Sequence, residues 1–222
     1  MKIKGIIFDL DDTLVDRSRS LTIFSTIFHS HYKTRLLPVP TFKIEGIVKN
    51  ADQDGYRPKI ESFSEMIQEL AWKKEPTVSE LAEFWKKEFP GCAQPVSDLY
   101  EVLDEIDRRG IAMGVVTNGP THSQTGKIRQ LRISKYLKSV IISEAVGVKK
   151  PDPEIFYLAL QKLQLKPSET LAIGDNPILD VVGARNAGLK PVWVTGHFSW
   201  PEEYRPPDYQ ISDLKQLLTI IE

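Results

Sequence analysis

Six short apolar runs, rich in β-branched residues, constrain the fold of this chain more than any other feature. They are Ile3–Phe8, Ile111–Val116, Ser139–Ser143, Thr170–Ile173, Pro191–Thr195 and Tyr209–Ile211. The runs lack polar alternation, which is typical of parallel strands that helices cover on both faces. From about residue 97 onward, helical patterns alternate with these runs, and Asn176-Pro177 has the form of a helix start. We therefore predict an α/β fold with a doubly wound parallel sheet.

The segment between the first two runs has a different rhythm. Residues 17–92 show helical spacing and no convincing strand, with turn signals at Pro38-Val39-Pro40, Asp54-Gly55 and Pro90-Gly91. We predict a smaller, all-helical domain over 17–92, inserted into an α/β core domain formed by 1–16 and 93–222. An insertion after the first strand would make a natural lid.

Composition excludes several classes of protein. The 222 residues are 41% hydrophobic and 27% charged with a net charge of -1, which is unlike a disordered chain or a strongly basic nucleic-acid binder. Cys92 is the single cysteine, so no internal disulfide and no cysteine-based zinc cluster can form. No apolar stretch approaches the roughly 18 residues that span a bilayer. Since Asp9 interrupts the apolar start of the chain before a signal peptide could form, we expect a soluble cytoplasmic protein with neither membrane nor nucleic-acid partners. The sequence does not predict the oligomeric state.

The strongest chemical signal is Asp9-Leu10-Asp11-Asp12-Thr13, which directly follows the first apolar run. The carboxyl ends of strands in an open parallel sheet form the ligand crevice. Two carboxylates so close together repel, so either a cation lies between them or one has a raised pKa and carries a proton. Both arrangements suit phosphoryl transfer. An ionised aspartate can attack phosphorus, and its neighbour can donate a proton to the leaving oxygen and then take one from water.

Three further polar motifs follow apolar runs. Thr117-Asn118-Gly119 offers a hydroxyl and turn amides that can bind phosphate. Lys150, next to Pro151, can supply a positive charge. The segment from Gly174-Asp175 to Asp180 adds two carboxylates, although Asp175 or Asn176 could equally cap a helix.

In a parallel sheet these motifs converge on one edge. The converging groups are Asp9, Asp11, Asp175, Asp180 and Lys150. So many carboxylates in one crevice require a hard divalent cation, and ligation by oxygen alone favours Mg²⁺ over zinc or copper.

A second pattern, which resembles a phosphate-binding P-loop, lacks the required spacing and residues. Gly119…Gly126-Lys127 looks like a P-loop, but six residues rather than four separate the glycines. Ile128 stands where a serine or threonine should hold magnesium. We therefore reject a P-loop at this position.

Taken in order, the four motifs resemble those of the haloacid dehalogenase superfamily. The matching residues are Asp9-Leu-Asp11-Asp-Thr13, Thr117-Asn118, Lys150-Pro151 and Gly174-Asp175…Asp180, which span the chain from residue 5 to about 180. The resemblance implies a Rossmann-like core and, with this insertion, the kind of helical cap that follows the first strand.

The resemblance also implies residue roles. Asp9 would be the nucleophile and Asp11 the general acid/base, while Thr117 and the Asn118 amide would hold the phosphate and Lys150 would neutralise charge.

For the metal, the resemblance implies Mg²⁺ bound by Asp9, the Asp11 backbone carbonyl and Asp175. Thr13 and Asp180 would support these groups from behind.

The choice among activities depends on Asp11. The dehalogenases of the superfamily lack an aspartate two residues after the nucleophile, so Asp11 favours phosphate chemistry. The leading hypothesis is a Mg²⁺-dependent phosphatase for a small phosphorylated metabolite, such as a sugar phosphate or nucleotide, with an aspartyl-phosphate intermediate on Asp9. A sugar phosphomutase is the main alternative, and a non-catalytic binding protein on the same scaffold is a third.

Overall fold

The computed structural model describes residues 2–221, and the chain divides into two compact units. Unit 1 combines the residues up to Val15 with those from Pro95 onward, and unit 2 is the continuous segment Asp16–Gln94. The chain passes between the units at β2 (Val15–Asp16) and β3 (Gln94–Pro95), which form a small separate sheet. Over residues 2–221, no helix has both the length and the apolar character needed to cross a bilayer.

Unit 1 contains a six-stranded sheet in the order β5-β4-β1-β6-β7-β8, and every neighbouring pair is parallel. The strands are β1 (Gly5–Phe8), β4 (Ala112–Thr117), β5 (Leu137–Ile142), β6 (Thr170–Gly174), β7 (Lys190–Val194) and β8 (Tyr209–Ile211). Each of the six overlaps one of the predicted apolar runs, with ends that differ by at most two residues. The Rossmann-like, doubly wound α/β prediction is therefore confirmed.

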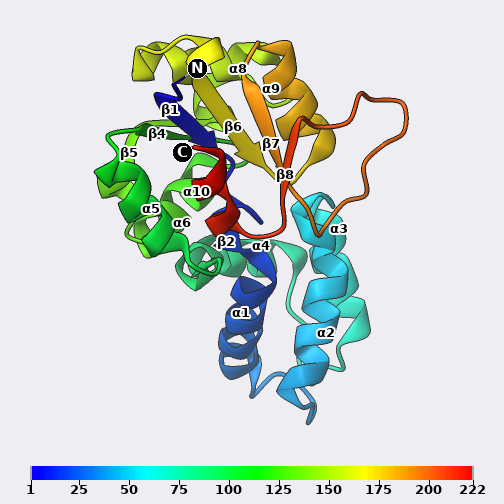
Figure 1. Cartoon of the computed structure of the whole chain (residues 1–222). Helices are drawn as coiled ribbons and strands as arrows, with labels where there is room; N and C mark the ends of the chain where they lie inside the picture. The colour runs from blue at the N-terminus through cyan, green and yellow to red at the C-terminus, as the bar shows by residue number, and fades with distance from the viewer. Residues whose placement is uncertain (1, 222) are drawn as a thin grey trace. The chain divides into compact units, whose positions relative to one another are not determined.

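Helices cover both faces of this sheet because its central strands carry apolar side chains on both sides. Ile6, Ile7 and Phe8 of β1 are each no more than 1% exposed. Ile7 belongs to a core cluster with residues of α8 (Pro153–Leu163) and α9 (Gly183–Asn186). On the other face, Figure 1 shows α5 (Leu99–Arg108) together with α10 (Leu217–Ile220). The remaining helices that follow strands are α6 (Thr121–Gln130) and the short α7 (Ser143–Val146).

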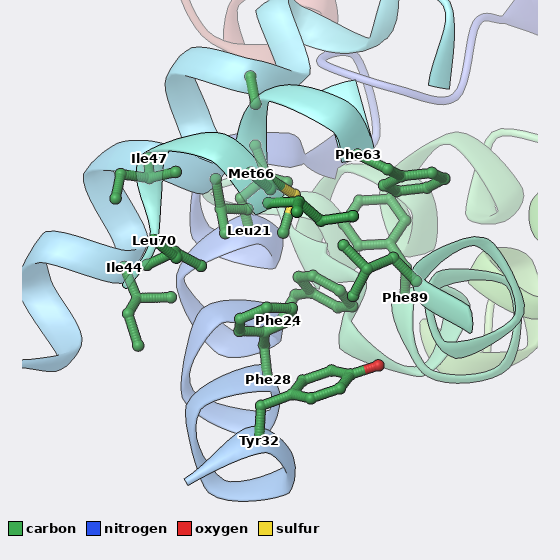
Figure 2. Close-up of a cluster of buried hydrophobic side chains, with 14 of the residues drawn as sticks. Leu21, Phe24, Phe28, Tyr32, Ile44, Ile47, Phe63, Met66, Leu70 and Phe89 are labelled. Atoms are coloured by element: carbon green, nitrogen blue, oxygen red, sulfur yellow. The ribbon is translucent and has the colours of Figure 1, made fainter. Parts of the chain in front are cut away.

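Unit 2 is helical, as its spacing predicts. Its helices are α1 (Arg17–Tyr32), α2 (Thr41–Asp52), α3 (Lys59–Glu69) and α4 (Val78–Glu88), with 3-10 turns at Gln53–Gly55 and Phe89–Cys92. An aromatic and aliphatic cluster fills the space between them (Figure 2). Phe24, Phe28 and Tyr32 project from one face of α1 at intervals of four residues, and each is no more than 1% exposed. The helical pattern was therefore a correct guide to the core of this unit, while its role as a lid stays a prediction.

Candidate active site

The polar residues that follow β1, β4 and β6 lie at one edge of the sheet because these three strands are adjacent and parallel. Asp9 comes directly after β1, and its backbone N–H donates to Ile173 O at 2.8 Å. Thr117 is the last residue of β4, and Asp175 follows β6. The fold thus brings together motifs that the sequence separates by more than half of the chain.

Lys150 is the cation at the centre of this edge. Its side chain is 3% exposed, and its Nζ pairs with Asp9 Oδ1 and, at 2.6 Å, with Asp180 Oδ1. Burial acts to lower the pKa of Lys150, but the charges and hydrogen bonds of Asp180 and Asp9 outweigh it and raise the pKa. Lys150 therefore carries a full positive charge between two carboxylates.

The side chain of Asn118 fixes the backbone of Lys150. Asn118 Nδ2 donates to Lys150 O at 3.1 Å, and Lys150 N donates to Asn118 Oδ1 at 2.9 Å. Next to Asn118, Gly119 N donates to Ser143 Oγ at 3.0 Å. The Thr117-Asn118-Gly119 turn is thus held by hydrogen bonds to Lys150 and to Ser143. Turn amides and hydroxyls fixed in this way are suited to binding an anion.

Asp180 is held in place by the structure that follows β6. Asn176 caps the π-helical turn Pro177–Val182 by accepting from Ile178 N and Leu179 N. Asp180 Oδ2 then accepts from Asn176 N at 3.0 Å. A Cβ on Gly174 would lie 2.3 Å from Asp180 Cγ, so this close approach requires glycine. With one oxygen on Lys150 and the other on a backbone amide, Asp180 is a rigid support.

Three carboxylates, those of Asp9, Asp175 and Asp180, present oxygens within 4.8 Å of one another. Burial is the largest cause that raises the pKa of Asp9 to about 7, against the charge of Lys150. Burial, followed by the charges of Asp180 and Asp9, raises the pKa of Asp175 to about 9. Within residues 2–221, no donor hydrogen-bonds the Asp175 carboxylate. Two of these carboxylates, those of Asp9 and Asp180, pair with the Lys150 ammonium. The oxygen-only donor set of all three therefore carries surplus negative charge and fits a divalent cation that would offset it.

Asp11 contacts two side chains, those of Gln124 and Lys127, that the sequence motifs do not include. Lys127 Nζ pairs with both Asp11 oxygens, at 2.6 and 2.7 Å. Gln124 Nε2 donates to Asp11 Oδ2 at 3.0 Å and to Thr117 Oγ1 at 2.6 Å. In the sequence, Lys127 attracts attention only through the rejected P-loop pattern, whereas in the structure it lies inside α6. Its spacing of three from Gln124 was the available signal, but exposed helix faces carry the same residue types.

The remaining residues of the first motif form a tight turn. Asp12 has a positive φ of 55°, and its N–H donates to Val15 O at 2.8 Å. Thr13 is buried, with 2% of its surface exposed. Two residues from the sheet edge beyond β6 join this region. His197 Nε2 lies 3.6 Å from Asp12 Oδ1, and Trp193 Nε1 donates to Asp175 O at 2.7 Å.

Known proteins resemble the chain over nearly its full length. The model of the family described as haloacid dehalogenase-like hydrolase matches residues 6–194. A glyceraldehyde 3-phosphate phosphatase from Pyrococcus furiosus is 30% identical over 231 aligned positions, covering 100% of this chain and 94% of that protein. The pyrophosphatase PpaX from Oceanobacillus iheyensis is 28% identical, with coverage of 100% and 98%.

A solved structure shares the fold. The HAD-hydrolase YfnB from Bacillus subtilis, bound to magnesium, superposes with a TM-score of 0.77, covers 100% of both chains and is 21% identical. At this identity the likeness establishes the architecture and leaves the chemistry to be argued from the residues.

Proposed function

Since the chain belongs to the haloacid dehalogenase-like hydrolases and is a phosphoric monoester hydrolase, we propose that it is a magnesium-dependent phosphatase that forms an aspartyl-phosphate on Asp9. The observation that carries this proposal is the cluster around Lys150. There, Asp9 and Asp180 pair with one buried ammonium, and the Asp175 carboxylate presents an oxygen within 4.8 Å of theirs. Such a site has unbalanced negative charge at the end of the central strand, where a cation and a phosphate group would restore the balance.

The reaction follows from two carboxylates with different surroundings. An oxygen of Asp9 attacks phosphorus, the bond from phosphorus to the leaving oxygen breaks, and Asp11 gives that oxygen a proton. Water then attacks the phosphorus of the acyl phosphate, Asp11 takes the proton from water, and the Asp9 carboxylate is released with inorganic phosphate. Lys150, bonded to Asp9, offsets the negative charge of the approaching phosphate.

In this proposal the phosphate is held by Thr117 and the Asn118 backbone amide. Asn118 also keeps Lys150 in place through the two hydrogen bonds of its side chain. The phosphate-binding turn and the charge-neutralising lysine therefore move as one unit, which favours a preorganised site.

The metal ligands that we propose are Asp9, the Asp11 backbone carbonyl and Asp175. Asp180, which is bonded to Lys150 and Asn176, supports them, as does the buried Thr13. Bound magnesium would neutralise charge between the Asp9 nucleophile and the phosphate.

The substrate class that we propose is a small phosphorylated metabolite. The relatives' names support this proposal, since they include a glyceraldehyde 3-phosphate phosphatase, a phosphoserine phosphatase and a pyrophosphatase. These differ in the group beyond the phosphate, while the site described above is built around the phosphate itself.

The test is hydrolysis of p-nitrophenyl phosphate by the wild type and by Asp9→Asn, each with Mg²⁺ and with EDTA. We expect turnover that requires both Asp9 and Mg²⁺. Asp107→Asn is the matched control, because Asp107 is an exposed aspartate of α5. Acid quenching during turnover should trap phosphate on Asp9 of the wild type. Turnover that persists in EDTA or in Asp9→Asn would contradict the proposal.

A further inference from the structure

Gln124 and Lys127 form a buried polar pair on α6 that the reaction described above does not use. They lie three residues apart and so project from one face of the helix. Gln124 is 2% exposed and Lys127 is 3% exposed. Both contact Asp11, and Gln124 also contacts Thr117. The pair thus joins the two side chains to which the proposed function gives separate tasks, proton transfer and phosphate binding.

We infer that Gln124 and Lys127 are positioning residues that hold the Asp11 carboxylate at a fixed place beside the phosphate-binding Thr117. The inference rests on the proposed function, which makes Asp11 the general acid/base. It assigns the helix after β4 a part in catalysis that the four sequence motifs do not contain.

The contacts leave the Asp11 side chain little freedom. Lys127 Nζ bridges both of its oxygens, at 2.6 and 2.7 Å, which fixes the direction of the carboxylate. Gln124 Nε2 adds a bond to Oδ2 at 3.0 Å and, through its 2.6 Å bond to Thr117 Oγ1, sets the separation of Asp11 from Thr117. Asp11 still has 24% of its side chain exposed. A partly open carboxylate that is clamped from behind can meet a substrate oxygen without first losing rotational freedom.

Stability alone does not account for the pair. Burying an ammonium and an amide has a desolvation cost that well-packed apolar side chains at the same places would avoid. Gln124 and Lys127 are as deeply buried as Ile128, the apolar residue that follows Lys127 along α6 and is 5% exposed. The polar pair therefore gains its value from where it holds Asp11.

The expected consequence is a loss that depends on the leaving group. Protonation of the leaving oxygen by Asp11 contributes most to kcat/KM when that oxygen is strongly basic, as in an alkyl phosphate. It contributes least when the leaving group is p-nitrophenolate. A displacement of about 1 Å in a catalytic group can cost on the order of 10²-fold in rate. Loss of the clamp should therefore lower kcat/KM for alkyl phosphates much more than for p-nitrophenyl phosphate.

The experiment compares Lys127→Met and Gln124→Leu with the wild type. The substrates are p-nitrophenyl phosphate and the alkyl phosphomonoester that the wild type hydrolyses fastest in a panel. For Lys127→Met we expect a fall in kcat/KM of about 10²-fold with the alkyl ester and about tenfold or less with the aryl ester. Gln124→Leu should show the same pattern with smaller losses, and Lys127→Arg should recover part of the activity. Arg129→Met is the matched control, because Arg129 is an exposed cation on the same helix. Equal losses with both esters would overturn the inference.

A double variant separates positioning from a general structural role. In an Asp11→Asn background, Lys127→Met should change kcat/KM little further, because the residue acts through Asp11. An undiminished second loss would contradict the inference. Wild-type protein that hydrolyses no phosphate ester would refute the proposed function instead. The crystal structure of Lys127→Met then decides the inference, since it requires the Asp11 carboxylate to move, and an unmoved carboxylate would overturn it. If Lys127→Met does not fold, Gln124→Leu and Lys127→Arg carry the same measurements.

Discussion

Each unit of this protein buries a cluster of charges, and the two clusters have opposite balances. In unit 1, the Lys150 ammonium pairs with Asp9 and Asp180, and a third carboxylate, that of Asp175, presents an oxygen within 4.8 Å of theirs. In unit 2, the single carboxylate of Asp52 meets two cations. Arg17 binds it through Nε at 2.7 Å and Nη2 at 2.8 Å, and Lys59 Nζ lies 2.5 Å from Oδ1.

The balance of charge moves the pKa values in opposite directions. Burial acts to raise the pKa of Asp52, but the bonds and charges of Arg17 and then Lys59 outweigh it and lower the pKa. Burial and the excess of negative charge raise the pKa of Asp9 to about 7 and that of Asp175 to about 9. A fully compensated cluster fixes structure, whereas an undercompensated one keeps a place for a cation.

The cluster in unit 2 is well suited to a structural role because it joins the ends of three helices. Arg17 begins α1, Asp52 ends α2 and Lys59 begins α3. The turn between α2 and α3 contains Gly55 with φ +85°, and a Cβ there would lie 2.8 Å from the Arg17 guanidinium. The arginine is thus enclosed by backbone as well as by its partners.

Of the changes to these two clusters, Arg17→Met should have the largest effect on stability. It removes a two-point contact to a carboxylate that is 2% exposed and leaves Lys59 as its partner. Breaking a buried ion pair costs about 3 to 5 kcal/mol of the free energy of unfolding. Native-state hydrogen exchange should show this loss in α1 to α3 and little change in β1 and β4. Lys33→Met, at an exposed position just after α1, is the control. A change below about 0.5 kcal/mol in Arg17→Met would contradict a structural role.

The pH dependence of stability should have opposite signs in the two units of the metal-free protein. The pKa values of Asp9 and Asp175 lie above the ordinary aspartate value of 3.8, so the folded state holds extra protons and unit 1 loses stability as pH rises toward about 9. One extra proton held over two pH units corresponds to roughly 3 kcal/mol. The pKa of Asp52 is lowered, so its contribution is present above 3.8 and is lost as pH falls through its folded-state pKa.

Urea unfolding in EDTA, monitored by tryptophan fluorescence, measures how the stability of each unit changes with pH. Trp193 and Trp200 report on unit 1, and Trp72 and Trp85 report on unit 2, when the other pair is replaced by phenylalanine. Unit 1 that becomes more stable between about pH 6 and about pH 8 would refute the charge balance described here.

Magnesium should stabilise unit 1 alone. At a concentration about ten times its Kd, a ligand that binds only the folded state adds about 1.4 kcal/mol. The thermal unfolding midpoint, measured with and without EDTA, should rise for the wild type and for Asp107→Asn. In Asp175→Asn the midpoint should not respond, because a carboxylate of the cluster is missing. An equal response in that variant would place the ion elsewhere.

Lys59→Met should have the smallest effect. The Lys59 side chain is 33% exposed, and Arg17 keeps both of its bonds to Asp52 when the lysine is removed. A partly exposed ion pair contributes about 1 kcal/mol or less. Urea unfolding of unit 2 should therefore rank Lys59→Met well below Arg17→Met, and the reverse order would show that the lysine is the principal partner.

The sequence predicted the parts of the molecule that depend on local pattern. The six strands could be recognised because each is a short apolar run, and Asp9, Thr117 and Asp175 could be placed at one edge because parallel strands end together. Asn176-Pro177 likewise marked the cap that now orients Asp180.

The contacts that the sequence could not predict join residues far apart in the chain. Lys127 reaches Asp11 and Arg17 reaches Asp52, and in both cases the helical pattern shows only a polar position. Whether such a position faces solvent or a buried carboxylate depends on how the helix is rotated against its neighbours. The bonds between Asn118 and Lys150 are of the same kind, since the expected role of Asn118 concerned its backbone amide.

The position of β1 in the sheet has a consequence for synthesis of the chain. This strand precedes the other strands of its sheet in the chain. Its two neighbours in the sheet are β4 and β6, in which Ala112 and Thr170 are the residues opposite Gly5. Unit 2 is continuous and leaves the ribosome before either neighbour does, so it can begin to fold while both edges of β1 are still unpaired. The central strand of unit 1 is therefore the segment that a nascent chain must keep from pairing wrongly, and the length of the insertion determines how long it must do so.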